Sequence, residues 1–161
     1  MNDIAVIVKD LMALSIQKKI TISTAESCTG GLISKYITDQ PGSSNFFNSS
    51  IIAYSNESKI SLLHVQSKTI EEKGAVSEET VKEMAQGLLQ ITGSSVVIAV
   101  SGVMGADIDK GSQENTGVWL CWHNLDKYKT LYKGLYGGRR ENRLETTKIG
   151  LLGLYDFIKE I

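Results

Sequence analysis

The chain has 161 residues, 42% of them apolar and 22% charged, which is the composition of an ordinary globular protein. This length predicts one domain, spanning residues 1–161, that can bury a core without disulfides or a metal. Because 17 Lys and Arg residues nearly balance 18 Asp and Glu residues, the net charge of −1 excludes a general attraction to nucleic acid or to an anionic membrane.

The cysteines and the N-terminus indicate where the chain works. Cys28 and Cys121 lie far apart, with no Cys/His spacing around them, so no zinc site is expected. The first residues lack the basic start, unbroken apolar run and cleavage site of a signal peptide. No stretch reaches the length of a membrane span. We therefore expect a cytoplasmic protein with free thiols.

Hydrophobic periodicity predicts helices and strands that alternate along most of the chain. Helices are expected at residues 4–18, 32–40, 56–63, 67–73, 77–91 and 140–161. Strands are expected at residues 20–24, 50–54, 95–101, 116–122 and 129–136. Alternation early in the chain and a hairpin late in it predict an α/β fold, a three-layer α/β/α sandwich with a mixed sheet.

The first candidate site is TAESCTGG, residues 24–31, where the first strand hands over to a helix. Unpaired N–H groups at such a helix start favour a bound phosphate or a developing oxyanion. Ser27 or Cys28 could then act as a nucleophile presented by this turn. The alternative is purely structural, with a capping serine, a buried cysteine and a glycine turn.

A serine nucleophile needs a base, and three residues qualify. His64 and His123 are conventional bases, but no motif surrounds either of them. Lys59 follows the second predicted strand closely, and a buried lysine can lose its proton near neutral pH. Tyr54 could donate a hydrogen bond to the serine. The alternative is a strand-end tyrosine and a solvated lysine.

Two further segments could contact a ligand. Ser101, Gly102 and Gly105 follow the most buried strand, where ligands of open α/β sheets bind. The alternative there is an ordinary strand-to-loop turn.

Three arginines open the last helix: Arg139, Arg140 and Arg143. Positive charge at a helix start opposes the helix dipole, so a bound phosphate or carboxylate would explain it. Salt bridges to Glu141 and Glu145 are the alternative.

Taken in chain order, these segments resemble the CinA C-terminal domain family. TAESCTGGLIS contains the family's A-E-S-C-T-G-G block, and PGSSNFF and IIAYSNESK resemble its P-G-S-S run and Y-S-N-x-x-K segment. GAVSEETVKEMAQG, SGVMG and GGRRENR resemble its G-A-V-S helix start, S/T-G-x-x-G turn and G-D-R-x-x-x-R entry to the last helix. Their order and spacing over nearly the whole chain argue against chance agreement.

The resemblance implies a nicotinamide-nucleotide amidase, which hydrolyses nicotinamide mononucleotide to nicotinic acid mononucleotide and ammonia. It assigns Ser27 as nucleophile, Lys59 as general base and Tyr54 as a supporting donor. The pyridine mononucleotide would contact Glu26, Thr29, Gly30, Gly31, Ser101, Gly102, Gly105, Arg139 and Arg143. The family fold is an α/β/α sandwich that forms homodimers or larger homo-oligomers and requires neither cofactor nor metal. Larger members carry an additional N-terminal molybdopterin-binding-like domain. Because 161 residues leave no room for that domain, we expect a stand-alone amidase domain here.

The chain departs from the family pattern in two places. Residues 106–117 lack the prolines of the family's P-G-G and K-P-V-G runs and contain Asp107 and Asp109 instead. Gly138 replaces the aspartate of G-D-R. The altered loop leaves open a nucleotide-binding module without catalysis. Two further alternatives are an amidase or esterase for another small substrate and a nucleophile at Cys28 in place of the serine.

Overall fold

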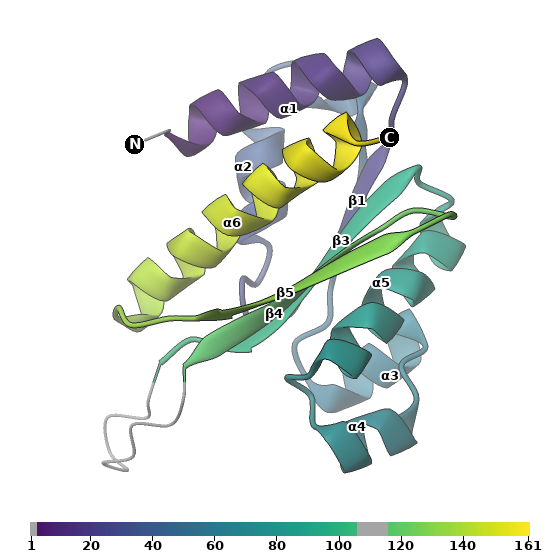
Figure 1. The fold of residues 1–161 in the computed structure, drawn as a ribbon, viewed down its shortest axis with the longest axis vertical. Coiled ribbons are helices and arrows are strands. Elements are labelled where there is room, and N and C mark those ends of the chain that lie inside the picture. The colour runs from purple at the N-terminus through teal and green to yellow at the C-terminus, as the bar shows by residue number, and fades with distance from the viewer. Residues whose placement is uncertain (1–2, 106–115) are drawn as a thin grey trace.

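The computed structural model describes residues 3–105 and 116–161, which form three layers (Figure 1). The helices are α1 (Ile4–Lys18), α2 (Leu32–Thr38), α3 (Asn56–Leu63), α4 (Ser67–Lys73), α5 (Glu78–Thr92) and α6 (Arg139–Lys159), with a 3₁₀ turn η1 (Ser43–Asn45). The strands are β1 (Ile22–Glu26), β2 (Phe47–Ile52), β3 (Val96–Val103), β4 (Gly117–His123) and β5 (Tyr128–Gly134). Helices cover both faces of the sheet, so the predicted α/β/α sandwich is confirmed.

The order of the strands determines where a ligand can bind. The sheet runs β2-β1-β3-β4-β5, with β1 parallel to β2 and β3, and with β4 antiparallel to both of its neighbours. The sheet is therefore mixed, as predicted. In the β1–β3 register Glu26 lies beside Val100, and the next N–H along, that of Ser27, donates to the Val100 carbonyl at 3.1 Å. The carboxyl ends of β1 and β3 thus meet at one edge of the sheet.

The first strand lies two residues further along than predicted. Residues 20–24 alternate in hydrophobicity, but β1 is buried at all five positions of Ile22–Glu26. A central strand covered by helices on both faces shows no alternation, so the pattern that predicted the strand was misleading here. The other predicted ends differ from the observed ones by at most three residues.

Helices α1, α2 and α6 cover one face of the sheet. Leu11 of α1, Ile33 of α2 and Leu151 of α6 are completely buried in the core on this side. The indole of Trp122 on β4 donates to the Gly150 carbonyl of α6 at 3.0 Å. Helix α6 is therefore held directly against the sheet.

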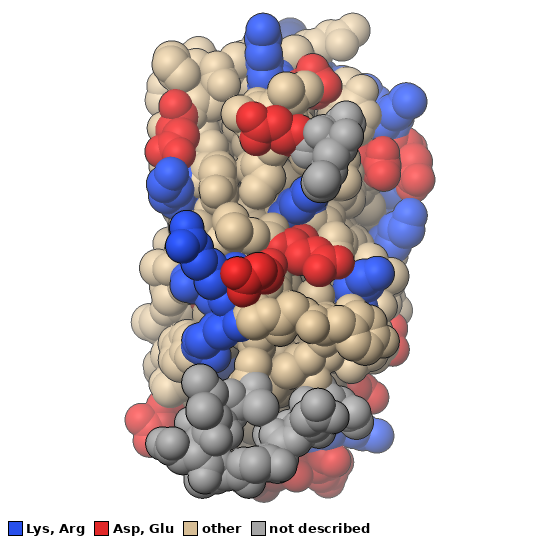
Figure 2. All heavy atoms as spheres, turned by 90° about the vertical axis from the view of Figure 1, so that its left-hand side faces the viewer, with Lys and Arg blue, Asp and Glu red and all other residues tan. Residues whose placement is uncertain are grey.

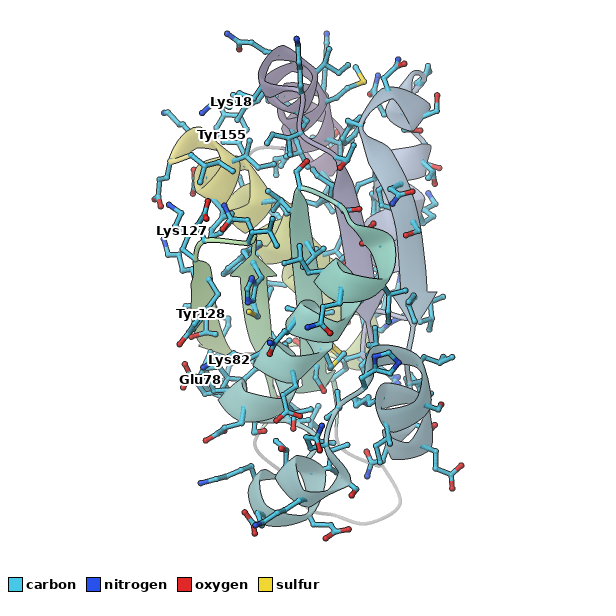
Figure 3. All side chains as sticks on the ribbon, turned by 90° about the vertical axis from the view of Figure 1, so that its right-hand side faces the viewer. Lys18, Glu78, Lys82, Lys127, Tyr128 and Tyr155 are labelled. Atoms are coloured by element: carbon cyan, nitrogen blue, oxygen red, sulfur yellow. The ribbon has the colours of Figure 1, made fainter. Side chains whose placement is uncertain are left out.

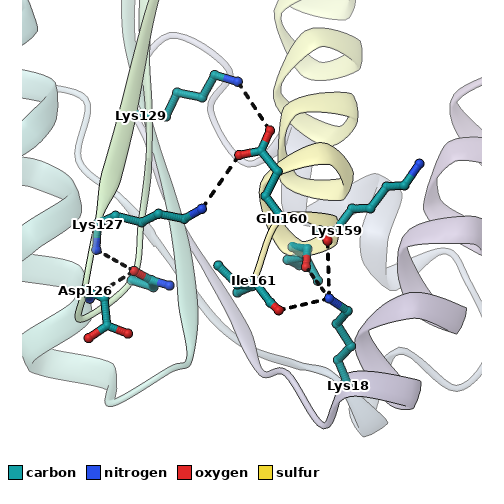
Figure 4. A network of polar contacts seen from close by, with 9 residues as sticks. Lys18, Asp126, Lys127, Lys129, Lys159, Glu160 and Ile161 are labelled. Carbon is teal, nitrogen blue, oxygen red and sulfur yellow. Dashed lines mark hydrogen bonds and ion pairs between the residues drawn. The ribbon is translucent and has the colours of Figure 1, made fainter.

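The C-terminal end of the long helix α6 is anchored by the contacts shown in Figure 4. The amine of Lys18 on α1 donates to the carbonyl oxygens of Ile158 and Ile161, both at 3.1 Å. Glu160 pairs with Lys127 at 3.7 Å and Lys129 at 3.9 Å, near the β4–β5 turn and on β5. These contacts hold the helix so that its N-terminal end reaches the carboxyl edge of β1 and β3.

Helix α5 covers the opposite face, with α3 and α4 packed beside it (Figure 1). Thr130 of β5 donates to the Glu78 carboxylate at 2.7 Å, and Lys82 donates to the Tyr128 hydroxyl at 3.0 Å (Figure 3). Helix α3 lies so close to α5 that a Cβ at Gly87 would overlap the Leu63 carbonyl oxygen. The position of α3 is therefore set by backbone contact with α5.

The surface carries both signs of charge. Acidic and basic side chains are interspersed on the face shown in Figure 2, in agreement with the net charge of −1. Of the helices that the structure describes, none combines the length and the apolar character needed to cross a membrane.

Candidate active site

The central feature of the site is a direct hydrogen bond between two buried side chains. The amine of Lys59 lies 3.0 Å from the Ser27 hydroxyl oxygen. Lys59 is 2% exposed and Ser27 is 6% exposed. Burial lowers the pKa of the Lys59 amine because the charged form loses its hydration. The arrangement presents a hydroxyl nucleophile beside an amine that can accept its proton.

Local structure explains how Lys59 reaches this position. The hydroxyl of Ser55 caps α3 by accepting the Ser58 N–H at 3.1 Å, so the helix begins directly after β2. Lys59 lies in the first turn of α3, and its amine also donates to the Tyr54 carbonyl at 3.0 Å. The strand end and the helix start therefore aim the amine at the neighbouring strand, β1.

The adjacent cysteine is not suited to be the nucleophile. Burial raises the pKa of the Cys28 thiol to about 12, and the positive charges of Lys59 and Arg143 only partly oppose this. A thiol with such a pKa is almost wholly protonated at neutral pH, whereas the reactive form is the thiolate. Between the two candidate nucleophiles of the turn, the structure favours Ser27.

A cavity of about 270 Å³ opens above this pair, at the carboxyl ends of β1 and β3. Its described lining comes from five segments: Ser27, Cys28, Tyr54, Asn56, Lys59, Ala75, Val76, Ser101, Gly102, Val103, Met104, Gly105 and Arg139. No histidine is among these described lining residues, so Lys59 is the base that the geometry offers. The cavity lies where ligands of α/β sheets bind.

The Glu26 carboxylate binds the start of α2. Its carboxylate is fully buried and accepts the N–H groups of Gly31, Ile33 and Ser34 at 2.8–3.0 Å and the Thr29 hydroxyl at 2.6 Å. The protein's own carboxylate thus occupies the anion position at the start of α2. These N–H groups and the Thr29 hydroxyl are therefore bonded within the protein, and ligand contacts at Glu26 and Thr29 stay a prediction.

The turn between β1 and α2 depends on its two glycines. Gly30 has φ +57° and Gly31 has φ +94°, conformations that an L side chain rarely adopts. A Cβ on Gly30 would also stand 3.3 Å from the guanidinium of Arg143. Neither glycine lines the cavity in the described part of the chain, so both serve the shape of the turn.

The two arginines of the G-D-R-like segment have separate places. Arg143 donates to the carbonyl oxygens of Cys28 at 3.2 Å and Thr29 at 2.7 Å, and it does not line the cavity. Arg139 does line the cavity and donates to the Tyr54 hydroxyl at 2.9 Å. The described residues form no ion pair with Arg140, Glu141 or Glu145, so the expected salt bridges are not found there.

Tyr54 contributes to the pair through its backbone. Its carbonyl accepts the Lys59 hydrogen bond, while its side chain is 60% exposed and its hydroxyl is bound by Arg139. Within the described residues, the Tyr54 hydroxyl has no hydrogen bond to Ser27 or Lys59. In this conformation the hydroxyl is therefore not a direct donor to the nucleophile.

The end of β3 and the two residues that follow it form another wall of the cavity. The Ser101 hydroxyl is buried and donates to the Ala75 carbonyl at 2.8 Å, which holds the segment before α5 against β3. A Cβ on Gly102 would lie 2.5 Å from the Gly117 carbonyl oxygen, so a larger residue does not fit. Gly105 faces the start of α6 at Arg139. Residues 106–115 lie outside the described residues. They include Asp107 and Asp109, which depart from the family pattern.

Asn142 is a buried residue of this site that the sequence reasoning missed. Its amide donates to the carbonyls of Met104 at 2.7 Å and Gly137 at 2.9 Å, and its oxygen accepts the Gly137 N–H. These bonds join the cavity wall to the start of α6. The only signal in the sequence was an amide between two arginine positions, which carries no information about burial.

Fold and geometry together define the class of this protein: a three-layer α/β/α domain with a buried Ser–Lys pair at the carboxyl edge of its parallel strands. The CinA C-terminal domain family matches residues 4–158. The chain therefore belongs to the CinA C-terminal domain family, as its motifs predicted.

Similar proteins agree with this assignment. A CinA-like protein of Petrotoga mobilis is 41% identical over 140 residues, which are 87% of this chain and 35% of the relative. A CinA-like protein of Endomicrobium trichonymphae is 44% identical over 144 residues, 86% of this chain and 33% of the relative. The chain thus spans about a third of the length of these curated relatives.

Solved structures share the whole fold. The competence/damage inducible protein CihA of Agrobacterium tumefaciens is 33% identical with a TM-score of 0.86, covering 96% of this chain and 94% of that one. The competence damage-inducible protein A of Klebsiella pneumoniae is 27% identical with a TM-score of 0.90, covering 96% of both chains. The similarity therefore includes all three layers.

Proposed function

We propose that this domain is a nicotinamide-nucleotide amidase that uses Ser27 as nucleophile and Lys59 as general base. The observation that carries the proposal is the 3.0 Å hydrogen bond between the Lys59 amine and the Ser27 hydroxyl, with both side chains buried. A solvated lysine would be charged and unable to accept a proton, whereas a desolvated one has a lowered pKa. The substrate class follows from the family resemblance and not from the pair itself.

The proposed reaction begins with proton transfer from Ser27 to neutral Lys59. The Ser27 oxygen then attacks the carboxamide carbon of nicotinamide mononucleotide, and N–H groups stabilise the tetrahedral oxyanion. The candidate donors to this oxyanion are the N–H groups of Cys28 and Thr29, which donate no hydrogen bond to another described residue. A single such donor contributes about 3–4 kcal/mol in a serine hydrolase.

Protonated Lys59 next gives its proton to the departing nitrogen, and ammonia leaves. Water then hydrolyses the acyl-enzyme to nicotinic acid mononucleotide, again with Lys59 as base. Arg139 supports binding of the nucleotide phosphate, because it lines the cavity with a guanidinium that suits phosphate oxygens. A bound phosphate would compete with the Tyr54 hydroxyl for this guanidinium and so free the hydroxyl.

Release of ammonia from nicotinamide mononucleotide by the purified protein tests this function. Ser27→Ala and Lys59→Ala should each abolish release while the protein stays folded by circular dichroism. Turnover at the normal rate in either variant would refute the assignment of that residue. Binding of the nucleotide by calorimetry without turnover would indicate a binding module, and activity confined to other amides or esters would indicate a different substrate.

A further inference from the structure

Arg143, which lies on α6, makes two side-chain hydrogen bonds to the turn that carries Ser27. Among the described residues, no other member of the expected ligand set reaches this turn from α6 in this way. The Nε of Arg143 donates to the Cys28 carbonyl at 3.2 Å, and its Nη2 donates to the Thr29 carbonyl at 2.7 Å. These donors are directed at the protein and not at the cavity, whose described lining does not include Arg143. A ligand phosphate would have to displace two charge-assisted hydrogen bonds to reach this guanidinium.

The same turn is also held by a negative charge. Glu26 accepts the N–H groups of Gly31, Ile33 and Ser34, while Arg143 takes the carbonyl oxygens that precede them. The turn that follows Ser27 is therefore held by a guanidinium at its first two carbonyl oxygens and by a carboxylate at N–H groups further along the chain. Each partner satisfies polar groups that would otherwise be buried without a bond.

The contact also sets the direction of the peptide group next to the nucleophile. In a trans peptide the C=O and N–H bonds point in opposite directions. Because Arg143 holds the Cys28 carbonyl toward α6, the N–H of Thr29 points away from α6. A positive charge on the carbonyl oxygen also polarises the peptide group and makes that N–H a stronger donor.

From these contacts we infer that Arg143 is a positioning residue, which holds the Ser27 turn in its reactive shape and does not bind the substrate phosphate. The charge of Arg143 reaches the turn, since it lowers the pKa of the Cys28 thiol against the larger effect of burial. Gly30 permits the contact, because any side chain there would approach the guanidinium. The two arginines of the last helix thus divide their roles, with Arg139 facing the cavity and Arg143 facing the turn.

The inference rests on the proposed function only for its kinetic readout. For Arg143→Met, kcat for ammonia release should fall about 10- to 100-fold, the effect of losing hydrogen bonds to a charged group. KM should stay within about threefold. The loss should be equal for nicotinamide mononucleotide and nicotinamide riboside, which lacks the phosphate. Arg140→Met is the matched control, because Arg140 is exposed and has no described hydrogen bond or ion pair, and it should behave as wild type.

A readout independent of the amide substrate separates the two proposals. The rate at which a fluorophosphonate labels Ser27 reports the reactivity of the serine alone. Arg143→Met should lower this rate about as much as kcat, and Arg143→Lys should fall between, since an ammonium lacks the planar fork. Guanidinium chloride at millimolar concentration should restore part of the labelling in Arg143→Ala, which a merely folding-related role would not allow.

Three results would overturn the inference: labelling of Arg143→Met at the wild-type rate, a loss confined to KM for the phosphorylated substrate, or no labelling of Ser27 in the wild-type protein. Slower labelling of Arg143→Met in a protein that releases no ammonia from either substrate would support the positioning role while refuting the proposed amidase function. The two failures are therefore distinguishable.

Discussion

The Lys59 amine donates a hydrogen bond to the Ser27 hydroxyl and so joins the segments that follow two neighbouring parallel strands. Ser27 follows β1, and Lys59 lies in the helix that follows β2, the neighbouring parallel strand. Parallel pairing brings the two carboxyl ends to the same edge, so residues 32 positions apart become direct neighbours. The proposed chemistry depends on this contact.

The two candidate nucleophiles give opposite predictions. Ser27→Ala should lower kcat for ammonia release by at least about 10³-fold, the scale seen when a nucleophile is removed from a serine hydrolase. Cys28→Ala should keep activity within about tenfold, because a thiol with a pKa of about 12 stays protonated at neutral pH. Iodoacetamide should not inhibit ammonia release by the wild-type protein. Inactivation by iodoacetamide at Cys28 would reverse the assignment.

Lys59 predicts that activity rises with pH. The base must be neutral, and burial lowers the pKa of its amine below the ordinary value of 10.5. A plot of kcat/KM against pH should therefore rise through a pKa below 10.5 and then level off. Lys59→Arg should be inactive at every pH, since a guanidinium keeps its proton. A profile that is flat from about pH 6 to pH 10 would argue against a lysine base.

Replacing Lys59 should also stabilise the fold. Because its pKa is lower in the folded state than in the unfolded chain, the charged amine destabilises the folded state at neutral pH, and this effect disappears as pH rises past 10.5. Lys59→Met should raise the melting temperature by about 2–4 °C for each kcal/mol gained, and the gain should shrink in alkali. A lower melting temperature at pH 7 would mean that the two hydrogen bonds of the amine outweigh the cost of burying it.

Tyr54→Phe distinguishes two roles for the tyrosine hydroxyl. The structure places that hydroxyl on Arg139, and the Tyr54 carbonyl that binds Lys59 is untouched by the substitution. We expect kcat to stay within about threefold and KM for the nucleotide to change, because a removed hydrogen bond alters how readily Arg139 meets a phosphate. A fall in kcat of a hundredfold with constant KM would instead put the hydroxyl in the proton path.

Gly87 tests how the fold positions Lys59. A Cβ at Gly87 would overlap the Leu63 carbonyl oxygen, so Gly87→Ala should push α3, which carries Lys59, away from α5. We expect the free energy of unfolding to fall by about 3 kcal/mol or more, with a matching loss of activity. Gly93→Ala is the control: Gly93 has φ +63° and nothing within 4 Å, so only about 1 kcal/mol of backbone strain is expected. Equal losses in urea titrations would contradict the steric argument.

Local patterns were sufficient for most of the fold. Helical periodicity placed 4–18 with the observed ends, because that helix keeps one face in the core and one in solvent. The short helices at 56–63 and 67–73 also have the predicted ends. The strand at β1 was displaced because both of its faces are buried, and hydrophobic alternation then carries no signal. The motifs also singled out Ser27, Lys59 and Arg139, which the structure brings to one cavity.

By itself, the sequence determined the α/β alternation, the family and the residues that meet at the cavity, since these follow from periodicity and from motifs of a few residues. Tertiary structure decided which partner each polar group takes. Glu26 turned out to occupy the start of α2, Arg143 to bind the turn carbonyls and Asn142 to join the cavity wall to α6. Those choices depend on contacts between residues far apart in the chain, where the need to satisfy every buried donor and acceptor selects one arrangement.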